Sequence, residues 1–558
     1  MKAMLATLLL AASVLLPHWP RERAEFSYDD RDFIEANQSL RTPGDAFAAL
    51  LAPFPPDQPQ RGLYRPLTSL SYALDFQLGG GDARVFHRSN VVLYGVVVAL
   101  VFRLALSYGR SFGFALAFAL LFAVHPVHCD AVDAIAGRSE LLALLFSLAS
   151  LLAFLKARRS RAPGQTGRWL AASLAAYALA SASKETGVVL PAILAVHAWV
   201  MPLDPRRGAR PADLRQLAPY AGVLALYLVA RFTALGHFAP TEPLLRGVPF
   251  EIRLHTLGSV FIEDLRLLVF PNLLQTDFYY RQHVGIAAGA TARSLAGLAS
   301  FAMAAGALAW LTLRGGRARD GVGSEPPPAL ALAACALAIF LGFLFPVSHL
   351  LDFGALMAER FLFAPSAGFL LLVVLAGGAV LQRIVPAPGL RRGAAVALVG
   401  TLALAGALRS GARAAEWRDA VALWVAADRD LPDNAGIRAN LAAARIARGE
   451  LDAAAALLED SLARHPDHVE TLGNLGNLRL QQGRFEEARI AFERILVLAP
   501  GDFVTWNNLG VLETRRDRLV DAATCFRRSL ALNPNYAEAR RNLEAVEGRT
   551  GRASGAGR

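Results

Sequence analysis

Long apolar stretches recur through the first three quarters of this 558-residue chain, and they constrain its fold more than any other feature. They are rich in Leu, Ala, Val and Phe, and each is a candidate for crossing a bilayer. Only 18% of the residues are charged, whereas soluble proteins carry roughly 25%. The last quarter is polar and helical in pattern, without such a stretch. We therefore expect an all-α chain, with a polytopic membrane domain followed by a soluble domain.

Eleven candidate spans can be placed along the chain. They cover residues 4–16, 91–106, 112–124, 141–155, 169–182, 187–200, 217–235, 295–313, 330–346, 361–381 and 394–408. The first has no evident small-x-small cleavage site after it, which favours an uncleaved span over a signal peptide. A further apolar stretch at 255–270 contains Glu263, Asp264 and Arg266, so we expect a re-entrant or interfacial helix there.

The positions of Lys and Arg predict the orientation of these spans. The densely basic short loops alternate with cation-poor ones along the chain; they include residues 156–168, 206–215, 314–319 and 383–392. The positive-inside rule places these loops in the cytoplasm, with the amino terminus. The large first loop, residues 17–90, and the whole chain after the last span then share the outer face.

The net charge of +11 does not indicate nucleic-acid binding. The arginines cluster in short loops, as membrane topology requires, and the sequence shows no aromatic–basic platform. We therefore expect no nucleic-acid partner. The three cysteines, Cys129, Cys335 and Cys525, are scattered without metal-like spacing and imply no disulfide framework.

The carboxy-terminal quarter repeats with a period of 34 residues. Prolines mark this period at Pro432, Pro466, Pro500 and Pro534, and Asn–Leu pairs keep step at Asn440, Asn474, Asn508 and Asn542. A helix–turn–helix unit of this length resembles the tetratricopeptide repeat, or TPR. We place the membrane domain at 1–411, three full repeats with flanking helices at 412–548, and a disordered tail at 549–558. Such a solenoid favours peptide or protein binding; the alternative is that it only supports the membrane domain.

Polar motifs gather in the predicted outer loops. They read FSYDDRDFIEAN, YRPLTSLSYALD, FHRSNVVLYG, LFAVHPVHCDAVDAIAGRSELLA, KETGVVLP and FPVSHLLDFGALMAERFLFAPSAGF. Together with the repeats, in this order, they resemble the transmembrane and TPR-containing O-mannosyltransferase family, which belongs to the glycosyltransferases of C-type fold. The likeness covers nearly the whole chain, although the repeat array is shorter than the family's.

The resemblance implies an activity. A sugar, expected to be mannose, would pass from a polyprenyl-phosphate donor to Ser or Thr of a polypeptide held by the repeats. The donor is a substrate, so no cofactor is expected. The Ala- and Arg-rich composition favours a bacterial inner membrane with the repeats in the periplasm; the alternative is an endoplasmic-reticulum membrane with luminal repeats.

The resemblance also implies a catalytic acid in the first outer loop, near the end of the first span. Asp29 and Asp30 match that position. A positioned carboxylate can take the proton of an acceptor hydroxyl as the new glycosidic bond forms. One aspartate would be the base, with Asp29 slightly favoured, and the other would orient it; the alternative is a solvated acidic turn.

The donor phosphate needs cations on the outer side. Arg138, Lys184 and Arg360 are the candidates, because the short outer loops hold few others. The structural alternative is that Glu140 or Glu359 pairs with them. The further candidates for the substrate pocket are Arg65, His87, His125, His128, Glu140 and Glu359.

The motif HPVHCD could also be read as a metal site. His125 and His128 have suitable spacing, and Asp130 adds an oxygen ligand. However, Pro126 interrupts a regular helix there, and no further ligand is fixed by the sequence. We therefore expect no metal at this motif and assign the histidines to hydrogen bonding with sugar or acceptor.

Two other functions compete with the enzyme. A membrane scaffold could use the repeats to recruit partners, but it gives no reason for acids, histidines and arginines to gather on one face. A transporter would favour matching internal halves, and the sequence shows none. The enzyme hypothesis accounts for both the polar outer loops and the expected position of the repeats.

Overall fold

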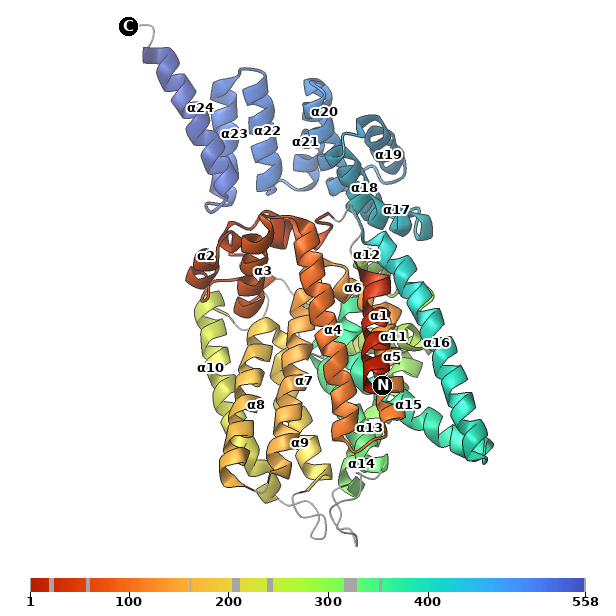
Figure 1. Ribbon diagram of the computed structural model, residues 1–558. Coiled ribbons are helices and arrows are strands. Elements are labelled where there is room, and N and C mark those ends of the chain that lie inside the picture. The colour runs from red at the N-terminus through yellow and green to blue at the C-terminus, as the bar shows by residue number, and fades with distance from the viewer. Residues whose placement is uncertain are drawn as a thin grey trace. The chain divides into compact units, whose positions relative to one another are not determined.

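The computed structural model describes residues 2–19, 25–56, 61–160, 162–202, 211–237, 244–315, 329–350 and 354–555. Throughout these ranges the chain forms helices and connecting segments without a strand, which confirms the all-α prediction. The chain divides into two compact units, Met1–Asp419 and Ala420–Arg558. Figure 1 shows both, coloured along the chain.

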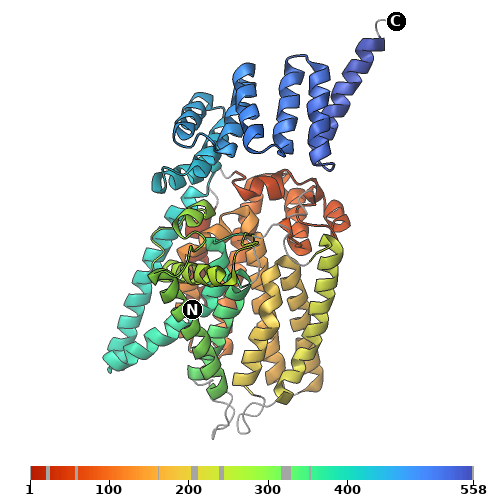
Figure 2. The same cartoon turned by 180° about the vertical axis from the view of Figure 1, so that it is seen from behind.

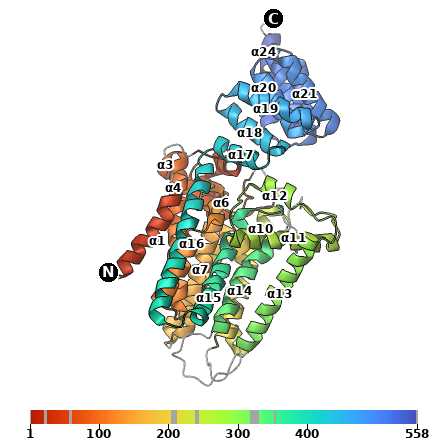
Figure 3. The same ribbon diagram turned by 90° about the vertical axis from the view of Figure 1, so that its right-hand side faces the viewer.

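The first unit is a helical bundle. Its helices are α1 (Lys2–His18), α2 (Pro43–Ala48), α3 (Pro66–Gly79), α4 (Ala83–Ser107), α5 (Phe112–Ala123), α6 (Cys129–Val132), α7 (Arg138–Arg159), α8 (Pro163–Ser183), α9 (Leu190–Val200), α10 (Ala218–Leu235), α11 (Phe250–Val269), α12 (Asp277–His283), α13 (Ala292–Gly315), α14 (Ala329–Leu344), α15 (Phe363–Ile384) and α16 (Pro388–Glu416). Within the bundle α4, α7 and α8 run side by side (Figure 1). Helix α10 lies at the edge of the bundle beside α8 (Figure 2), and α14 lies between α13 and α15 (Figure 3).

Among the described residues, seven helices are long and apolar enough to cross a membrane. The number is eight if α5 and the segment Pro126–Val132, which meet at a bend of 52°, form one span. Each of the eleven predicted stretches lies largely within a helix, but α1 and the Glu185–Val200 segment are shorter apolar helices, and α8 is not among the candidates. The chain is therefore a multi-pass membrane protein, and the count of eleven stays a prediction.

Burial separates central from peripheral helices. The apolar windows of the segments Ile135–Arg159 and Ala329–Val347 are each 72% buried, so α7 and α14 form the centre. The windows of α13 and α16 are only 11% buried. Within the described part of the chain these windows are therefore mostly exposed, and lipid tails are as apolar as the side chains that face them.

Small and hydroxyl side chains hold the central helices together. A Cβ on Gly368 of α15 would lie 2.3 Å from the carbonyl oxygen of Ala336 in α14. Only glycine permits this close approach of two backbones. Ser150 of α7 donates to the backbone oxygen of Ser173 in α8 at 2.8 Å. These contacts fix the helices whose ends carry the polar residues described below.

The second unit consists of paired helices. They are α17 (Ala420–Asp430), α18 (Ala435–Ala447), α19 (Leu451–Arg464), α20 (Val469–Gln481), α21 (Phe485–Leu498), α22 (Phe503–Arg515), α23 (Leu519–Leu532) and α24 (Ala537–Gly555). The turns of the first two full pairs contain Gly449 and Gly483 with φ of 79° and 74°, and Asp517 takes φ 61° in the third. Helix α24 continues past residue 548, where the sequence predicts the start of a disordered tail; residues 556–558 lie outside the described ranges.

Candidate functional site

Arg360 joins two acids from distant segments of the chain, Asp29 and Asp130. The Nη2 of Arg360 lies 3.4 Å from Oδ2 of Asp29, and its Nη1 lies 3.3 Å from Oδ1 of Asp130. The backbone N–H of Arg360 also donates to Oδ2 of Asp130 at 3.0 Å. The side chains of Asp29 and Arg360 are 25% and 24% exposed. This pair is therefore reachable from outside, while Asp130 is buried behind it.

The local backbone around Asp29 is held by its neighbour. Tyr28 adopts φ 51°, a left-handed conformation that is uncommon for a non-glycine residue. Its hydroxyl donates to Oδ1 of Asp277, the first residue of α12, at 2.7 Å. The contact joins the first loop to the segment after α11. Neither Asp277 nor Tyr28 is among the residues predicted from the sequence for the site.

Electrostatics favour a proton-accepting role for Asp29. Burial raises the pKa of its carboxyl above the ordinary value, the nearby Arg360 guanidinium lowers it, and Asp277 raises it again. Burial dominates, so the net shift is upward. A carboxylate with a raised pKa has a higher proton affinity, which is what a general base for a hydroxyl requires.

Asp30 has a different environment. It is fully buried, and its Oδ1 accepts the backbone N–H of Ala136 at 2.7 Å while its Oδ2 accepts that of Ser27 at 3.2 Å. Burial raises its pKa to about 7, and these backbone hydrogen bonds partly oppose the rise. Asp30 thus ties the first loop to the segment before α7. The two adjacent aspartates point to separate partners, and the geometry favours Asp29 as the accessible one.

Arg138, the first residue of α7, is enclosed by protein. Its side chain is 1% exposed and forms an ion pair with Asp75 of α3 at 2.5 Å. Its Nε donates to Asn90 Oδ1 at 2.8 Å, and Nη2 donates to the carbonyl oxygen of Phe86 at 2.9 Å. Through these contacts the Arg138 guanidinium holds α3, α4 and α7 together. Its position favours the structural alternative over a phosphate contact.

Lys184 is also paired within the protein. It follows α8, is buried, and its Nζ contacts Oε1 of Glu140 in α7. Beside this pair, Arg65 donates through Nη2 to Glu185 at 3.0 Å. Of the three predicted phosphate ligands, Arg360 is thus the one whose guanidinium borders Asp29.

Glu359 contacts a cation that sequence analysis did not consider. It is buried, lies 3.3 Å from Nη2 of Arg413 near the end of α16, and accepts the Tyr280 hydroxyl at 3.1 Å. The sequence predicted Glu359 or Glu140 as a partner of Arg138, Lys184 or Arg360. Glu140 does pair with Lys184, whereas Glu359 joins α16 and α12 to the start of α15.

The histidines of HPVHCD are packed into the bundle. His128 lies 2.8 Å from both the Tyr94 hydroxyl and Ser366 Oγ, one at each ring nitrogen. His125 Nε2 lies 3.1 Å from the carbonyl oxygen of Leu268. Asp130 contacts Arg360 instead. The three residues considered as metal ligands, His125, His128 and Asp130, therefore have separate partners. His87 is buried in α4, away from this group, and lines a small cavity described below.

Comparisons with known proteins identify one matching family model and several sequence relatives. The tetratricopeptide repeat family model matches residues 440–503. Protein O-mannosyl-transferase Tmtc2 of Drosophila melanogaster is 30% identical over 271 residues, which cover 46% of this chain and 28% of the relative. Protein O-mannosyl-transferase TMTC3 of Mus musculus is 26% identical over 396 residues, which cover 65% of this chain and 41% of the relative. The chain matches less than half of the length of either.

A solved structure also aligns with this chain. ArnT from Cupriavidus metallidurans, crystallised with undecaprenyl phosphate, is 13% identical over 78% of this chain and 79% of ArnT, with a TM-score of 0.38. This likeness is too distant to carry an argument, so the statement of homology rests on the sequence relatives. The chain is a homologue of the protein O-mannosyl-transferases TMTC2 and TMTC3 and carries tetratricopeptide repeats.

Proposed function

We propose that the protein is a membrane glycosyltransferase that moves a sugar, mannose, from a polyprenyl-phosphate donor to Ser or Thr hydroxyls of a polypeptide. The observation that carries the proposal is the accessible pair of Asp29 and Arg360 at 3.4 Å. The names of the homologues support the sugar and the acceptor. A carboxylate and a guanidinium are the two groups that transfer from a lipid phosphate requires.

Asp29 and Arg360 divide the chemistry between them. The Asp29 carboxylate takes the hydroxyl proton as the acceptor oxygen bonds to the anomeric carbon. The bond from that carbon to the phosphate oxygen breaks, and the lipid phosphate leaves with the electron pair. Arg360 binds the phosphate and stabilises the charge that grows on it, which is a use of preorganised donors that typically contributes most to catalysis.

Asp130 positions Arg360 for this role. Its two oxygens contact the guanidinium and the backbone N–H of Arg360. A guanidinium fixed from behind keeps its outward donors in place, and little conformational entropy is lost when phosphate binds. Asp277 acts on the other side, through the Tyr28 hydroxyl, to hold the loop that carries Asp29.

The remaining parts of the proposal concern the acceptor and the membrane face. The acceptor polypeptide binds the repeats, since stacked repeats of this kind present extended binding surfaces. The reaction takes place on the outer face, periplasmic or luminal, as the basic short loops imply. The second candidate, a scaffold without activity, is favoured by the repeats alone.

Reconstituted protein and a panel of radiolabelled polyprenyl-phosphate sugars test the proposal. We expect label from polyprenyl-phosphate mannose to appear in a Ser/Thr-containing polypeptide, in a linkage that alkaline β-elimination releases. Transfer of a different sugar would show that the proposed donor is wrong, but the protein would still be a glycosyltransferase. A folded, polypeptide-binding protein that transfers no sugar would favour the scaffold.

A further inference from the structure

Three metal-ligating side chains meet where α1 ends. His18 is the last residue of α1, Cys129 begins α6, and Asp133 follows the end of α6. One ligand atom of each lies within 4.8 Å of the other two, and all three residues are buried. The Nδ1 of His18 lies 2.9 Å and 3.1 Å from the two carboxylate oxygens of Asp133. Imidazole nitrogen, thiolate sulfur and carboxylate oxygen are the donors that Zn²⁺ takes in proteins.

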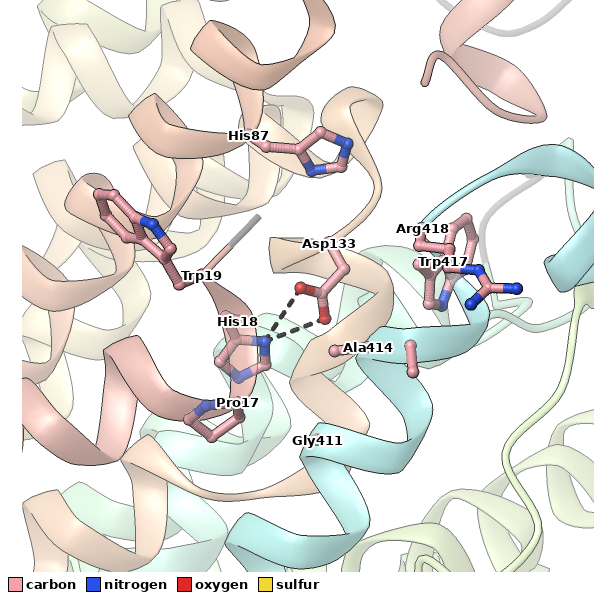
Figure 4. A pocket seen from close by; sticks show the side chains of 10 residues that line it. Pro17, His18, Trp19, His87, Asp133, Gly411, Ala414, Trp417 and Arg418 are labelled. Carbon is pink, nitrogen blue, oxygen red and sulfur yellow. Dashed lines mark hydrogen bonds and ion pairs between the residues drawn. The ribbon is translucent and has the colours of Figure 1, made fainter. Parts of the chain in front are cut away.

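A cavity of about 40 Å³ adjoins this cluster. His18, Asp133, His87 and Trp417 are among its lining residues, and Figure 4 shows them. The Nε2 atoms of both histidines and the Nε1 of Trp417 are buried and have no hydrogen-bond partner in the part of the chain that the structure describes. Buried polar groups normally have partners. Three unpartnered nitrogens around one cavity therefore indicate that it takes a polar ligand.

An ion pair between His18 and Asp133 does not account for the whole cluster. It would satisfy Nδ1 of His18, and the thiol of Cys129 has two partners of its own, the Asp133 carboxylate and the carbonyl oxygen of Ser410 at 3.5 Å. It would also leave the Nε2 of His87 without a partner in the described part of the chain. A divalent cation uses all three side chains and gives the cavity a ligand.

We propose that His18, Cys129 and Asp133 bind a divalent metal ion of the Zn²⁺ class, with a fourth position open to the cavity. Binding converts the Cys129 thiol to a thiolate, and the thiol proton is released to solvent. A three-ligand site with one exchangeable position is an established arrangement for zinc. His87, whose Nε2 has no hydrogen-bond partner among the described residues, lines the same cavity.

The ion links the end of α1 to α6. Beyond His18 the chain enters the first loop, which reaches Asp29 eleven residues later. Asp130 lies in α6, one residue after Cys129, and positions Arg360. A metal bound here therefore holds in place the start of the first loop and the start of α6. The inference stands apart from the proposed function, because the site binds metal whether or not the protein transfers sugar.

Cobalt binding to the purified full-length protein tests the site. We expect metal-stripped protein to take up one equivalent of Co²⁺ with a thiolate-to-cobalt charge-transfer band, and Zn²⁺ to displace it. Cys129→Ala should abolish the band. Cys335→Ala is the matched control, because Cys335 is likewise buried and free but lies in α14 outside the cluster; it should keep the band.

A second variant keeps the test decisive if Cys129→Ala does not fold. Asp133→Asn retains the side-chain shape and removes the anionic ligand. It should raise the Co²⁺ concentration for half-saturation by at least about 100-fold, since even outer-shell partners of metal sites cost about 10–100-fold in affinity. The proposal is overturned if folded wild-type protein shows no charge-transfer band, or if Cys129→Ala retains it. Retention of wild-type affinity by Asp133→Asn would likewise overturn the three-ligand site.

Discussion

Arg360 bridges Asp29 and Asp130, with its guanidinium 3.4 Å from one carboxylate and 3.3 Å from the other. The arrangement places an accessible base and an accessible cation side by side, and a buried acid fixes the cation. Each contact joins segments far apart in the chain. The predictions below test these roles separately from the contacts that hold the bundle together.

Replacing Arg360 by Gln should lower the rate of sugar transfer by about 100-fold or more, as removal of a transition-state donor does elsewhere. It should also move the pH dependence. Arg360 lowers the pKa of Asp29, so its loss raises that pKa further. Because a base is lost as pH falls through its pKa, the acidic limb of kcat/KM should shift to higher pH. A variant with full activity and an unmoved acidic limb would exclude this role.

Arg138 should affect stability through its buried ion pair. Removing one partner of such a pair typically costs about 3–5 kcal/mol of unfolding free energy. We expect Arg138→Gln to lower the thermal unfolding temperature strongly, because Asp75 would remain buried and unpaired. At temperatures where the variant is folded, its KM for the lipid donor should match that of the wild type.

The exposed pair of Arg84 and Asp82 supplies the control for that experiment. Its side chains are 49% and 35% exposed, and surface ion pairs contribute little to stability. Arg84→Gln should therefore unfold near the wild-type temperature. If Arg138→Gln were as stable as Arg84→Gln but bound donor poorly, Arg138 would be a phosphate ligand after all.

Asp30 should make stability depend on pH. Its folded-state pKa is raised from 3.8 to about 7, so the folded protein holds a proton that the unfolded chain has released across this range. Stability contributed by this group is therefore lost as pH rises from 3.8 towards about 7. Asp30→Asn keeps a carbonyl acceptor for Ala136 and cannot ionise.

Thermal unfolding in detergent at a series of pH values tests this role of Asp30. The difference between Asp30→Asn and the wild type should grow in favour of the variant as pH rises to neutrality. A constant difference across the range would show that Asp30 has the same proton affinity in both states.

Gly483 should be required in the turn between α20 and α21. At φ 74° a Cβ is strained, and the left-handed conformation costs a residue with a side chain about 1–2 kcal/mol. Gly483→Ala should therefore speed amide hydrogen exchange in α20 and α21 of the full chain by about 5–30-fold. Gly501→Ala is the control, because a Cβ meets nothing within 4 Å at either glycine but Gly501 does not have a positive φ; equal exchange in the two variants would contradict the account.

The helices were largely predictable because their signals are local. The 34-residue period predicted helix–turn–helix units, and the structure has turns at Gly449 and Gly483 with the positive φ values that glycine favours. The apolar stretches likewise lie largely within helices of the first unit. Boundaries in the repeats follow from spacing alone, because each unit packs only on its neighbours.

The partners of the polar residues could not be predicted. The scarcity of cations in the outer loops selected Arg138, Lys184 and Arg360 alike, but two of them pair with Asp75 and Glu140 in the interior. The sequence favoured Asp29 over Asp30 only slightly, and in the structure Asp30 accepts hydrogen bonds from two backbone N–H groups. Such distinctions depend on long-range contacts, and one sequence carries no signal for them.

Sugar transfer by Asp29→Asn tests the central claim most directly. Asp32→Asn is the matched control, because Asp32 is an acid of the same loop with a side chain 62% exposed and an ion pair with Arg61. With radiolabelled polyprenyl-phosphate mannose, we expect Asp29→Asn to lose at least about 100-fold in rate, the contribution typical of a general base, while Asp32→Asn stays near wild type. Wild-type transfer by a folded Asp29→Asn variant would contradict the assignment of Asp29 as the base.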